Sequence, residues 1–181
     1  IEAQLAAPIK VIVGNPPYSV GQGSANDANQ NLRYPTLDSR ISETYAALST
    51  ATLKNSLYDS YVRAFRWATD RLGNQGVVAF VSNGGWLIGN TADGIRLSFR
   101  DEFRDIYVFN LKGNIRAHDW KREGGQIFGG GSQTAIAVTI AVRSDAAQSG
   151  CRIHYHDVGD YLSREQKLAA IDAADLQNTA W

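Results

Sequence analysis

The sequence lacks methionine altogether and contains only one cysteine and four prolines among its 181 residues. The single cysteine, Cys151, cannot form an internal disulfide or a thiolate metal cluster, which is typical of a reducing compartment. We therefore expect a cytoplasmic protein in which Cys151 is chemically inert. No apolar run approaches the roughly 18 residues of a membrane span, and no signal peptide opens the sequence. Because even the methionine of a start codon is absent, we expect the chain to be a piece of a longer protein.

An excess of charge of either sign is also lacking. The 18 Lys and Arg residues balance 18 Asp and Glu residues, so the formal net charge is zero. This balance excludes a globally basic nucleic-acid binder and leaves only local patches for nucleic-acid contact. With 44% hydrophobic and 20% charged residues, the chain can bury a core and is neither disordered nor a coiled coil. Its length is that of one ordinary domain.

Short apolar segments alternate with helical hydrophobic patterns along the sequence. Strands are predicted over residues 9–13, 77–81, 106–111, 135–142 and 152–157. Helices are predicted over residues 35–50, 57–72, 92–103 and 163–174. This alternation predicts the α/β class, with right-handed crossovers and a mostly parallel sheet covered by helices. A glycine-rich loop over 112–132, and no helix, joins the third and fourth strands, so one antiparallel strand is expected there.

Local signals also predict where helices begin and end, and which side chains they expose. Ser56 with Asp59 resembles a capping pair before the second helix, and Gly73 predicts the end of that helix. Ser163 with Gln166 predicts the start of the last helix. Charged residues of the second helix are expected on its surface, and the aromatic residues of the middle helices are expected in the core. The charged residues are Asp59, Arg63 and Arg66, and the aromatic residues are Tyr61, Phe65, Phe99 and Phe103.

The tetrapeptide Asn15-Pro16-Pro17-Tyr18 follows the first predicted strand, at the edge of the sheet where α/β proteins bind ligands. The two prolines end the strand because they lack amide donors and fix φ. Pro16 also keeps Asn15 out of the α region, so its amide oxygen and the Pro16 carbonyl are available as acceptors. Two such acceptors suit a planar NH2 group, and the Tyr18 ring offers a face for stacking. The simpler alternative is that the prolines only end the strand.

The tetrapeptide in this context resembles motif IV of the S-adenosylmethionine-dependent amino-methyltransferases. These enzymes modify adenine N6 in DNA or a glutamine amide in release factors. Residues 126–128 and 134–138 are similar to motif VIII of the adenine-specific enzymes, in which an aromatic residue covers the second face of a flipped base. Phe128 occupies the matching position. The alternative for Phe128 is that it seals the loop against the sheet.

Longer stretches are similar to the methylase region of type ISP restriction-modification proteins, which are often labelled helicases. These stretches are residues 33–40, 58–68, 82–87, 107–114 and 153–161. The resemblance implies the C-terminal half of a Rossmann-like methyltransferase fold, with S-adenosyl-L-methionine as cofactor and double-stranded DNA as partner. It implies catalytic roles for Asn15, Pro16, Pro17 and Tyr18, and base stacking by Tyr18 and Phe128. Tyr58 and Trp67 are further candidates for lining the target pocket.

The chain departs from a complete methyltransferase at its start. The family carries a glycine-rich turn and an acidic strand end before motif IV, and neither is present before Ile9. The Gly129-Gly130-Gly131 run does not replace them, because it precedes the wrong element. We therefore expect residues 1–150 to be a partial catalytic domain and residues 151–181 to be a strand–helix extension toward a target-recognition region. The isolated piece is expected to be inactive and to pair through the unsatisfied edge of its first strand, either with another copy or with its missing upstream half.

Basic residues in the loops are candidates for contacts to DNA phosphates, although such residues also form ordinary solvated surfaces. They are Arg33, Arg40, Lys112, Arg116, Lys121 and Arg122. His154 and His156 share one face of a strand beside Asp157, but no third ligand is identifiable, so no metal site is expected.

Two alternatives to the adenine methyltransferase remain open on the sequence. The chain could be a non-catalytic module that retains the fold for positioning DNA or docking a domain. A protein-glutamine methyltransferase is less favoured, because of the Phe128 region and the long loop after Tyr18.

Overall fold

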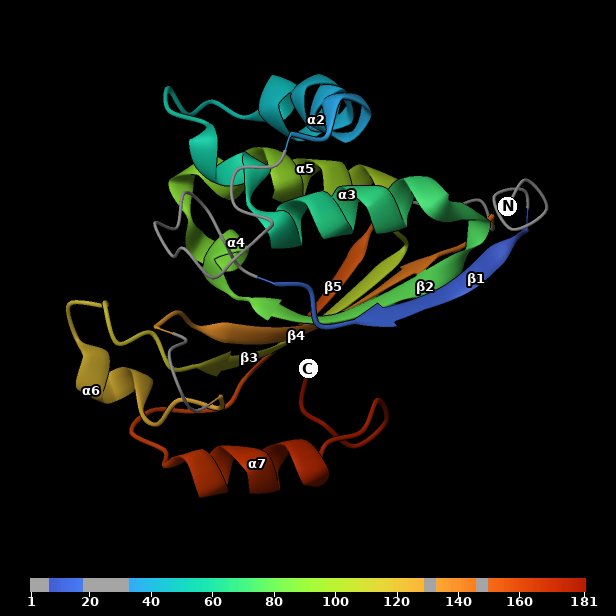
Figure 1. Cartoon of the computed structure of the whole chain (residues 1–181). Helices are drawn as coiled ribbons and strands as arrows, with labels where there is room; N and C mark the ends of the chain where they lie inside the picture. Colours follow the sequence, from blue (N-terminus) through green and yellow to red (C-terminus); the bar gives the residue numbers. More distant parts are fainter. Residues whose placement is uncertain (1–6, 18–32, 129–132, 146–149) are drawn as a thin grey trace.

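The computed structural model describes residues 7–17, 33–128, 133–145 and 150–181 (Figure 1). Its strands are β1 (Ile9–Gly14), β2 (Leu72–Asn83), β3 (Asp105–Lys112), β4 (Ile136–Arg143) and β5 (Arg152–Asp157). Its α-helices are α2 (Pro35–Ile41), α3 (Ser60–Arg71), α4 (Gly85–Ile88), α5 (Asp93–Glu102), α6 (Trp120–Glu123) and α7 (Arg164–Asp172). Shorter helical turns are η1 (Ser42–Ala46), η2 (Asn55–Tyr58) and η3 (Asn90–Ala92). In these described segments, no helix has the length and apolar character needed to cross a membrane.

The strands form one five-stranded sheet in the order β1-β2-β4-β3-β5. β1 runs parallel to β2, and β3 runs parallel to β5, whereas β4 is antiparallel to both of its neighbours. The α/β class and the reversed strand after the glycine-rich connection are therefore confirmed. Because β4 is reversed, it begins where β2 and β3 end: Asn83 and Lys112 both pair with Ile136. The loops after the parallel strands and the segment leading into β4 thus lie at the same end of the sheet, where the parallel strands have their carboxyl ends.

Helices cover the two faces of the sheet unequally. α3 and α5 lie on one face with α2 outside them, and α7 lies across the other face (Figure 1). The core between the sheet and α3 and α5 is aromatic. Phe65 lies 5.0 Å from Phe80 and 5.2 Å from Phe99 between ring centroids. Tyr61, Phe65, Phe99 and Phe103 are all buried, as the sequence predicts.

Several element boundaries differ from the prediction. The helix predicted over 35–50 widens after Ile41 into the π-type turn η1, which local hydrophobic spacing does not reveal. Ser56 lies in η2 and does not cap α3, because Asp59 is the cap and accepts from the Tyr61 amide. Gly73 does not end the helix in a loop. The chain becomes extended at Leu72 and enters β2 directly, since Leu72 pairs with Ile9.

The C-terminal elements follow the prediction closely, but two short helices were missed. β5 spans the predicted residues, and α7 begins with the predicted capping box. The Gln166 amide donates to Ser163 Oγ, while the Ser163 amide donates to Gln166 Oε1 at 2.8 Å. The short helix α6 lies in the segment predicted as a loop, and α4 lies where no element was predicted, because a single turn carries no hydrophobic period.

A buried ion network joins α3, α5 and β4. The Arg66 side chain is only 2% exposed and donates to both carboxylate oxygens of Glu102, at 2.8 Å each. Asp70 accepts from Arg66 at 2.7 Å, and Arg143 of β4 donates to Glu102 at 3.1 Å. The expectation that Arg66 lies on the helix surface is therefore wrong. Asp70 is four residues away, but Glu102 is 36 residues away, so the local sequence does not indicate the burial of Arg66.

Glu102 stays ionised inside this network. Burial alone would raise the pKa of Glu102, but hydrogen bonds from Arg66 and Ser98 and the charges of Arg66 and Arg143 lower it below its usual value. A depressed folded-state pKa stabilises the fold above the unfolded pKa of about 4.3. That contribution is lost as the pH falls through the lower pKa of the folded state.

We expect Glu102→Ala to lower the free energy of unfolding by about 3–5 kcal/mol, because it leaves Arg66 buried without its main partner. The neighbouring Asp101 is a matched control, since its ion pair with Arg100 is exposed on both sides. Asp101→Ala should change stability by less than about 1 kcal/mol. Urea unfolding followed by circular dichroism measures both variants. Equal effects of the two substitutions would contradict a structural role for the network.

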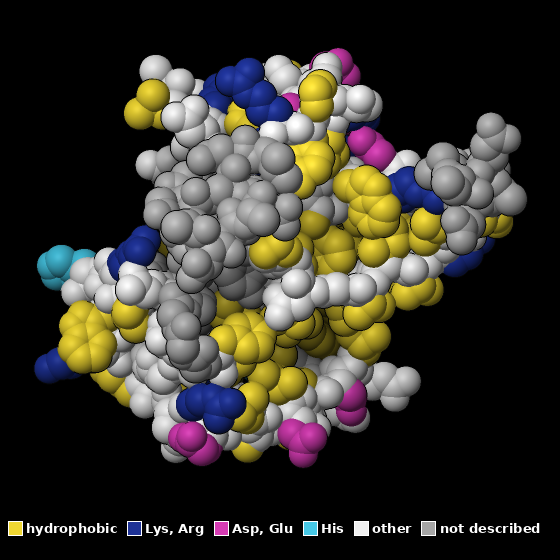
Figure 2. Space-filling view, in the orientation of Figure 1, with side chains coloured by type: hydrophobic (Ala, Val, Ile, Leu, Met, Phe, Trp, Pro, Cys, Tyr) yellow, Lys and Arg dark blue, Asp and Glu magenta, His cyan; other side chains and the backbone are white. Residues whose placement is uncertain are grey.

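β1 forms an edge of the sheet, because within the described residues it pairs only with β2. Its side chains are unusually apolar for an exposed strand: Val11 is 62% and Val13 is 74% exposed. Figure 2 shows hydrophobic side chains gathered in the hollow between the strands and α7. An apolar edge with unpaired backbone groups invites pairing with another strand.

We expect the isolated chain to associate through β1, and Val13→Lys to shift it toward the monomer, because a charge on an edge strand opposes pairing. Sedimentation velocity at several concentrations measures the change. Ile88→Lys is the control, since Ile88 is 84% exposed in α4 and lies on no strand edge. A wild-type chain that remains monomeric at every concentration would contradict this expectation.

Candidate functional site

Asn15 lies at the sheet edge where β1 ends. Gly14, the last residue of β1, pairs with Phe80, and an added Cβ at Gly14 would lie 3.3 Å from the Phe80 ring. This close packing fixes the strand end from which Asn15 follows. Asn15 is exposed, Pro16 is buried and Pro17 is exposed. The fold thus anchors the first proline and leaves the carboxamide residue at the surface, where a ligand can reach it. Tyr18 lies outside the described residues.

A cavity of about 290 Å³ adjoins Pro17. Its other walls come from α2, from the residue before α2 and from α3. The lining residues are Pro17, Tyr34, Leu37, Ser60, Arg63, Ala64 and Trp67. Trp67 is 47% exposed, so its indole is available to a flat ligand. Trp67 is one of the two aromatic candidates from the sequence. The other, Tyr58, does not line this cavity and packs against the hydrophobic core.

Arg63 gives the cavity a fixed cation that sequence reasoning placed on the helix surface. Its guanidinium donates to both carboxylate oxygens of Asp38, at 2.7 and 3.1 Å, and lies 5.4 Å from the Tyr34 ring centroid. Burial raises the pKa of Asp38. The hydrogen bonds from Arg63 and from the Tyr34 amide lower this pKa by more than burial raises it, so it lies below its usual value. Asp38 and Tyr34 thus hold Arg63 in place. The cavity therefore combines aromatic walls with a neutralised, rigid cation.

Phe128 lies in the segment before β4, and β2 lies between β4 and β1, the strand that Asn15 follows. Its side chain is half-buried and packs against a second hydrophobic cluster formed by Phe109, Leu111, Ile127 and Ile136. Phe128 therefore does seal the loop against the sheet, as the simpler alternative holds. Gly129, Gly130 and Gly131 lie outside the described residues.

The candidate phosphate-binding cations fall into two groups. Arg40 pairs with Glu43 and Asp70, Lys112 with Asp157 and Asp160, and Arg122 with Asp160. Burial lowers the pKa of Lys112, but its hydrogen bonds to Asp160 and Asp157 raise it above its usual value. The charges of this first group are compensated by the protein itself. The second group is exposed and, among the residues that the structure describes, forms no ion pair with a carboxylate; it consists of Arg33, Arg116 and Lys121.

His154 and His156 share one face of β5 but have different partners. His154 stacks on Tyr107 at 4.2 Å between ring centroids, and its Nε2 lies 3.2 Å from Asp105 Oδ1. His156 Nδ1 lies 2.9 Å from the Ala180 carbonyl. His154 therefore contacts the neighbouring strand β3, whereas His156 joins the C-terminal segment to the sheet. Across the described parts of the chain, no group of three or more His, Cys, Asp or Glu side chains is arranged to hold a metal ion.

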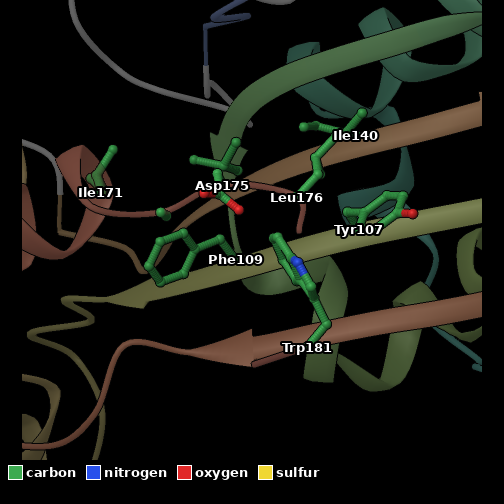
Figure 3. A pocket seen from close by; sticks show the side chains of 9 residues that line it. Tyr107, Phe109, Ile140, Ile171, Asp175, Leu176 and Trp181 are labelled. Atoms are coloured by element: carbon green, nitrogen blue, oxygen red, sulfur yellow. The ribbon is translucent and has the colours of Figure 1, made fainter. Parts of the chain in front are cut away.

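A second cavity, of about 200 Å³, lies on the α7 face of the sheet (Figure 3). Its walls come from β3, β4, α7 and the C-terminal segment, and they are almost entirely apolar. The lining residues are Tyr107, Phe109, Val138, Ile140, Ile171, Ala174, Asp175, Leu176 and Trp181. Since none of them comes from β1 or from residues 15–17, this cavity is separate from the candidate site.

The five-stranded α/β sheet with one reversed strand, and with an exposed amide at its carboxyl edge, is consistent with a methyltransferase-like fold. No protein-family model and no curated protein sequence matches the chain. Solved structures do. A nuclease-deletion mutant of the Type ISP restriction-modification enzyme LlaGI, in complex with a DNA substrate mimic, is 44% identical with a TM-score of 0.92 over 99% of this chain.

Two further structures are similar. The DrdV–DNA complex is 40% identical with a TM-score of 0.88 over 98% of this chain. The ATP-dependent Type ISP restriction-modification enzyme LlaBIII, bound to DNA, is 40% identical with a TM-score of 0.87 over 94% of this chain. The chain spans only 17% of the LlaGI and DrdV chains and 12% of the LlaBIII chain. It therefore corresponds to one segment of these larger proteins.

Proposed function

We propose that the chain is the catalytic part of a DNA adenine-N6 methyltransferase that acts in a restriction-modification system. The observation that carries this proposal is the strand end of β1, where Pro16 is buried and Asn15 is exposed. The similarity to DNA-bound restriction-modification enzymes supports DNA as the substrate. The cavity beside Pro17 supports a bound ring next to the same residues.

In the proposed reaction, the target adenine leaves the duplex, because its N6 amine is inaccessible inside the base stack. Asn15 Oδ1 and the Pro16 carbonyl accept the two N6 hydrogens and leave the nitrogen lone pair directed away from them. Tyr18 and Phe128 hold the two faces of the ring. These residues act by positioning and electrostatics, so no covalent enzyme intermediate is required.

S-adenosylmethionine supplies an activated methyl group on its sulfonium sulfur when bound. That methyl group would replace one N6 hydrogen of the adenine, whose proton would pass to solvent, while Asn15 Oδ1 and the Pro16 carbonyl hold the amine in place. Of the donor site this chain would supply only the neighbourhood of Asn15, because the glycine-rich turn and the acidic strand end of the family do not occur before Ile9. Pro17, Tyr34 and Trp67 line the cavity beside the diproline, and Trp67 would there line the pocket for the target base. Asn15 precedes Pro17, which lines this cavity, by two residues in the sequence.

A second candidate function is a non-catalytic module that positions DNA or docks a domain. The short span of the chain within the DNA-bound relatives favours it, because most of each relative lies outside the matched segment. Calorimetry with S-adenosylmethionine on the full-length protein separates the two functions, since only the methyltransferase binds the donor. Modification of a glutamine side chain in a protein is the third possibility, and the Phe128 region disfavours it.

We expect Asn15→Ala in the full-length protein to lower the rate of methyl transfer to DNA by about 100-fold or more, because it removes one of the acceptors that orient the amine. Transfer of tritiated methyl groups, with N6-methyladenine identified by mass spectrometry of nucleosides, measures the rate. Asn74→Ala is the matched control, since Asn74 is exposed in β2 away from this edge. An Asn15→Ala protein that methylates DNA at the wild-type rate would refute the assignment.

We expect Lys121→Gln to reduce the slope of log K against log salt for DNA binding by about 0.9, the value for one lost phosphate contact. Lys121 is exposed, its ammonium lies 5.9 Å from the Trp120 ring centroid, and it forms no ion pair with a carboxylate in the described part of the chain, so its charge can meet a phosphate. Arg40→Gln serves as the control, because Glu43 and Asp70 already neutralise Arg40. Fluorescence anisotropy of labelled duplex DNA gives both slopes. Equal slopes for wild type and Lys121→Gln would exclude this contact.

A further inference from the structure

The only fully buried residue of α7 is a lysine. Lys167 has no exposed surface, and its ammonium donates to the carbonyls of Glu123 and Gly125 at 2.7 Å each. Removing an ammonium from water is costly, and an apolar side chain would attach a helix to a protein at lower cost. Burial also lowers the pKa of Lys167, which agrees with an unfavourable environment for the charge. The lysine at this position is therefore explained by its directional hydrogen bonds and not by non-directional packing of α7 against the sheet.

The carbonyls that Lys167 holds belong to the segment leading to Phe128. The backbone of this segment runs against the turn before α7: the Gly125 amide donates to the Leu162 carbonyl at 2.8 Å, and the Tyr161 amide donates to the Arg122 carbonyl at 3.0 Å. Arg164 Nε donates to the Ile127 carbonyl at 2.9 Å. These contacts reach the residue directly before Phe128.

Gly124 shows how closely the two segments approach. Its φ of 70° lies in the region that favours glycine, and a Cβ there would collide with the Leu162 carbonyl oxygen. Figure 1 shows the α6 segment beside the start of α7. Salt bridges from Lys112 and Arg122 to Asp160 close the same contact at its outer side. The loop before β4 thus takes its conformation from the C-terminal element.

We propose that Lys167 is a positioning residue that fixes the backbone before Phe128 and so aims the Phe128 ring at the flipped base. This inference rests on the proposed methyltransferase function. It assigns to the strand–helix extension a part in the catalytic centre, because Lys167 and Arg164 hold three carbonyls of residues 123–127. A ring displaced by about 1 Å from its stacking position lowers the rate without removing any group that touches the substrate.

The test uses Lys167→Met in the full-length protein, since methionine keeps the length of the side chain and removes its donors. Lys54→Met is the matched control. The Lys54 ammonium also joins two carbonyls, those of Ala46 and Ser49, but in a segment on the opposite face of the sheet. We expect Lys167→Met to lower kcat for methyl transfer to DNA by about 10-fold to 100-fold, with KM for the donor unchanged. Lys54→Met should keep the wild-type kcat.

A double-mutant cycle with Phe128→Ala identifies the route of the effect. If Lys167 acts through Phe128, the double variant is no slower than Phe128→Ala alone. A wild-type kcat for Lys167→Met, or single effects that multiply in the double variant, would overturn the proposal. Should Lys167→Met fail to fold, Arg164→Gln removes the bond to Ile127 from an exposed position and should lower kcat in the same cycle.

Hydrogen exchange separates failure of this inference from failure of the proposed function. Lys167→Met should speed exchange of the amides of residues 123–128 and leave those of β2 and β4 protected. Unchanged exchange over 123–128 would overturn the positioning role whatever the protein catalyses. Absence of methyl transfer by the wild-type protein, with faster exchange in the variant, would refute the proposed function and leave the role of Lys167 in holding this loop intact.

Discussion

The reversed direction of β4 is the constraint on which the candidate site depends. Antiparallel pairing with both β2 and β3 places the start of β4 beside the ends of those strands, with Ile136 opposite Asn83 and Lys112. A parallel β4 would start at the opposite edge and would carry Phe128 away from Asn15. The direction of β4 therefore decides whether Phe128 and Asn15 can contact the same ligand.

Polar contacts with fixed directions hold the elements around this sheet, alongside the aromatic core. Arg66 and Glu102 join two helices to β4, and Lys167 joins α7 to the loop before β4. A hydrophobic contact tolerates small rotations of its partners, whereas a bidentate guanidinium or a two-carbonyl ammonium does not. Such contacts contribute less to stability than apolar burial, but they restrict the number of packing arrangements. The contacts of Arg66 and of Lys167 both occur where a helix or a loop must keep one orientation.

Much of this architecture could be predicted from the sequence, and the predictions of burial that were wrong share a cause. The first strand, the helix after Thr91, the last strand and the capping box at Ser163 depend on neighbours within a few residues, and they were predicted. The burial of Arg66 depends on Glu102, which lies 36 residues away, and that of Lys167 on Gly125, 42 residues away. Charged side chains are assigned to the surface unless such partners are known. The Asn15 segment was identified from its residues, whereas the cavity walls from Tyr34 and Arg63 required the fold.

The order of the strands also governs how the sheet can assemble during synthesis. β4 lies between β2 and β3 but follows both in the chain. As the polypeptide leaves the ribosome, β2 and β3 each emerge with a side that has no neighbour, and neither can be satisfied until Arg143 has left the exit tunnel. During that interval the nascent chain presents one open side of β2 and both sides of β3, since β5 follows β4 in the chain, and such unpaired strands are prone to aggregate.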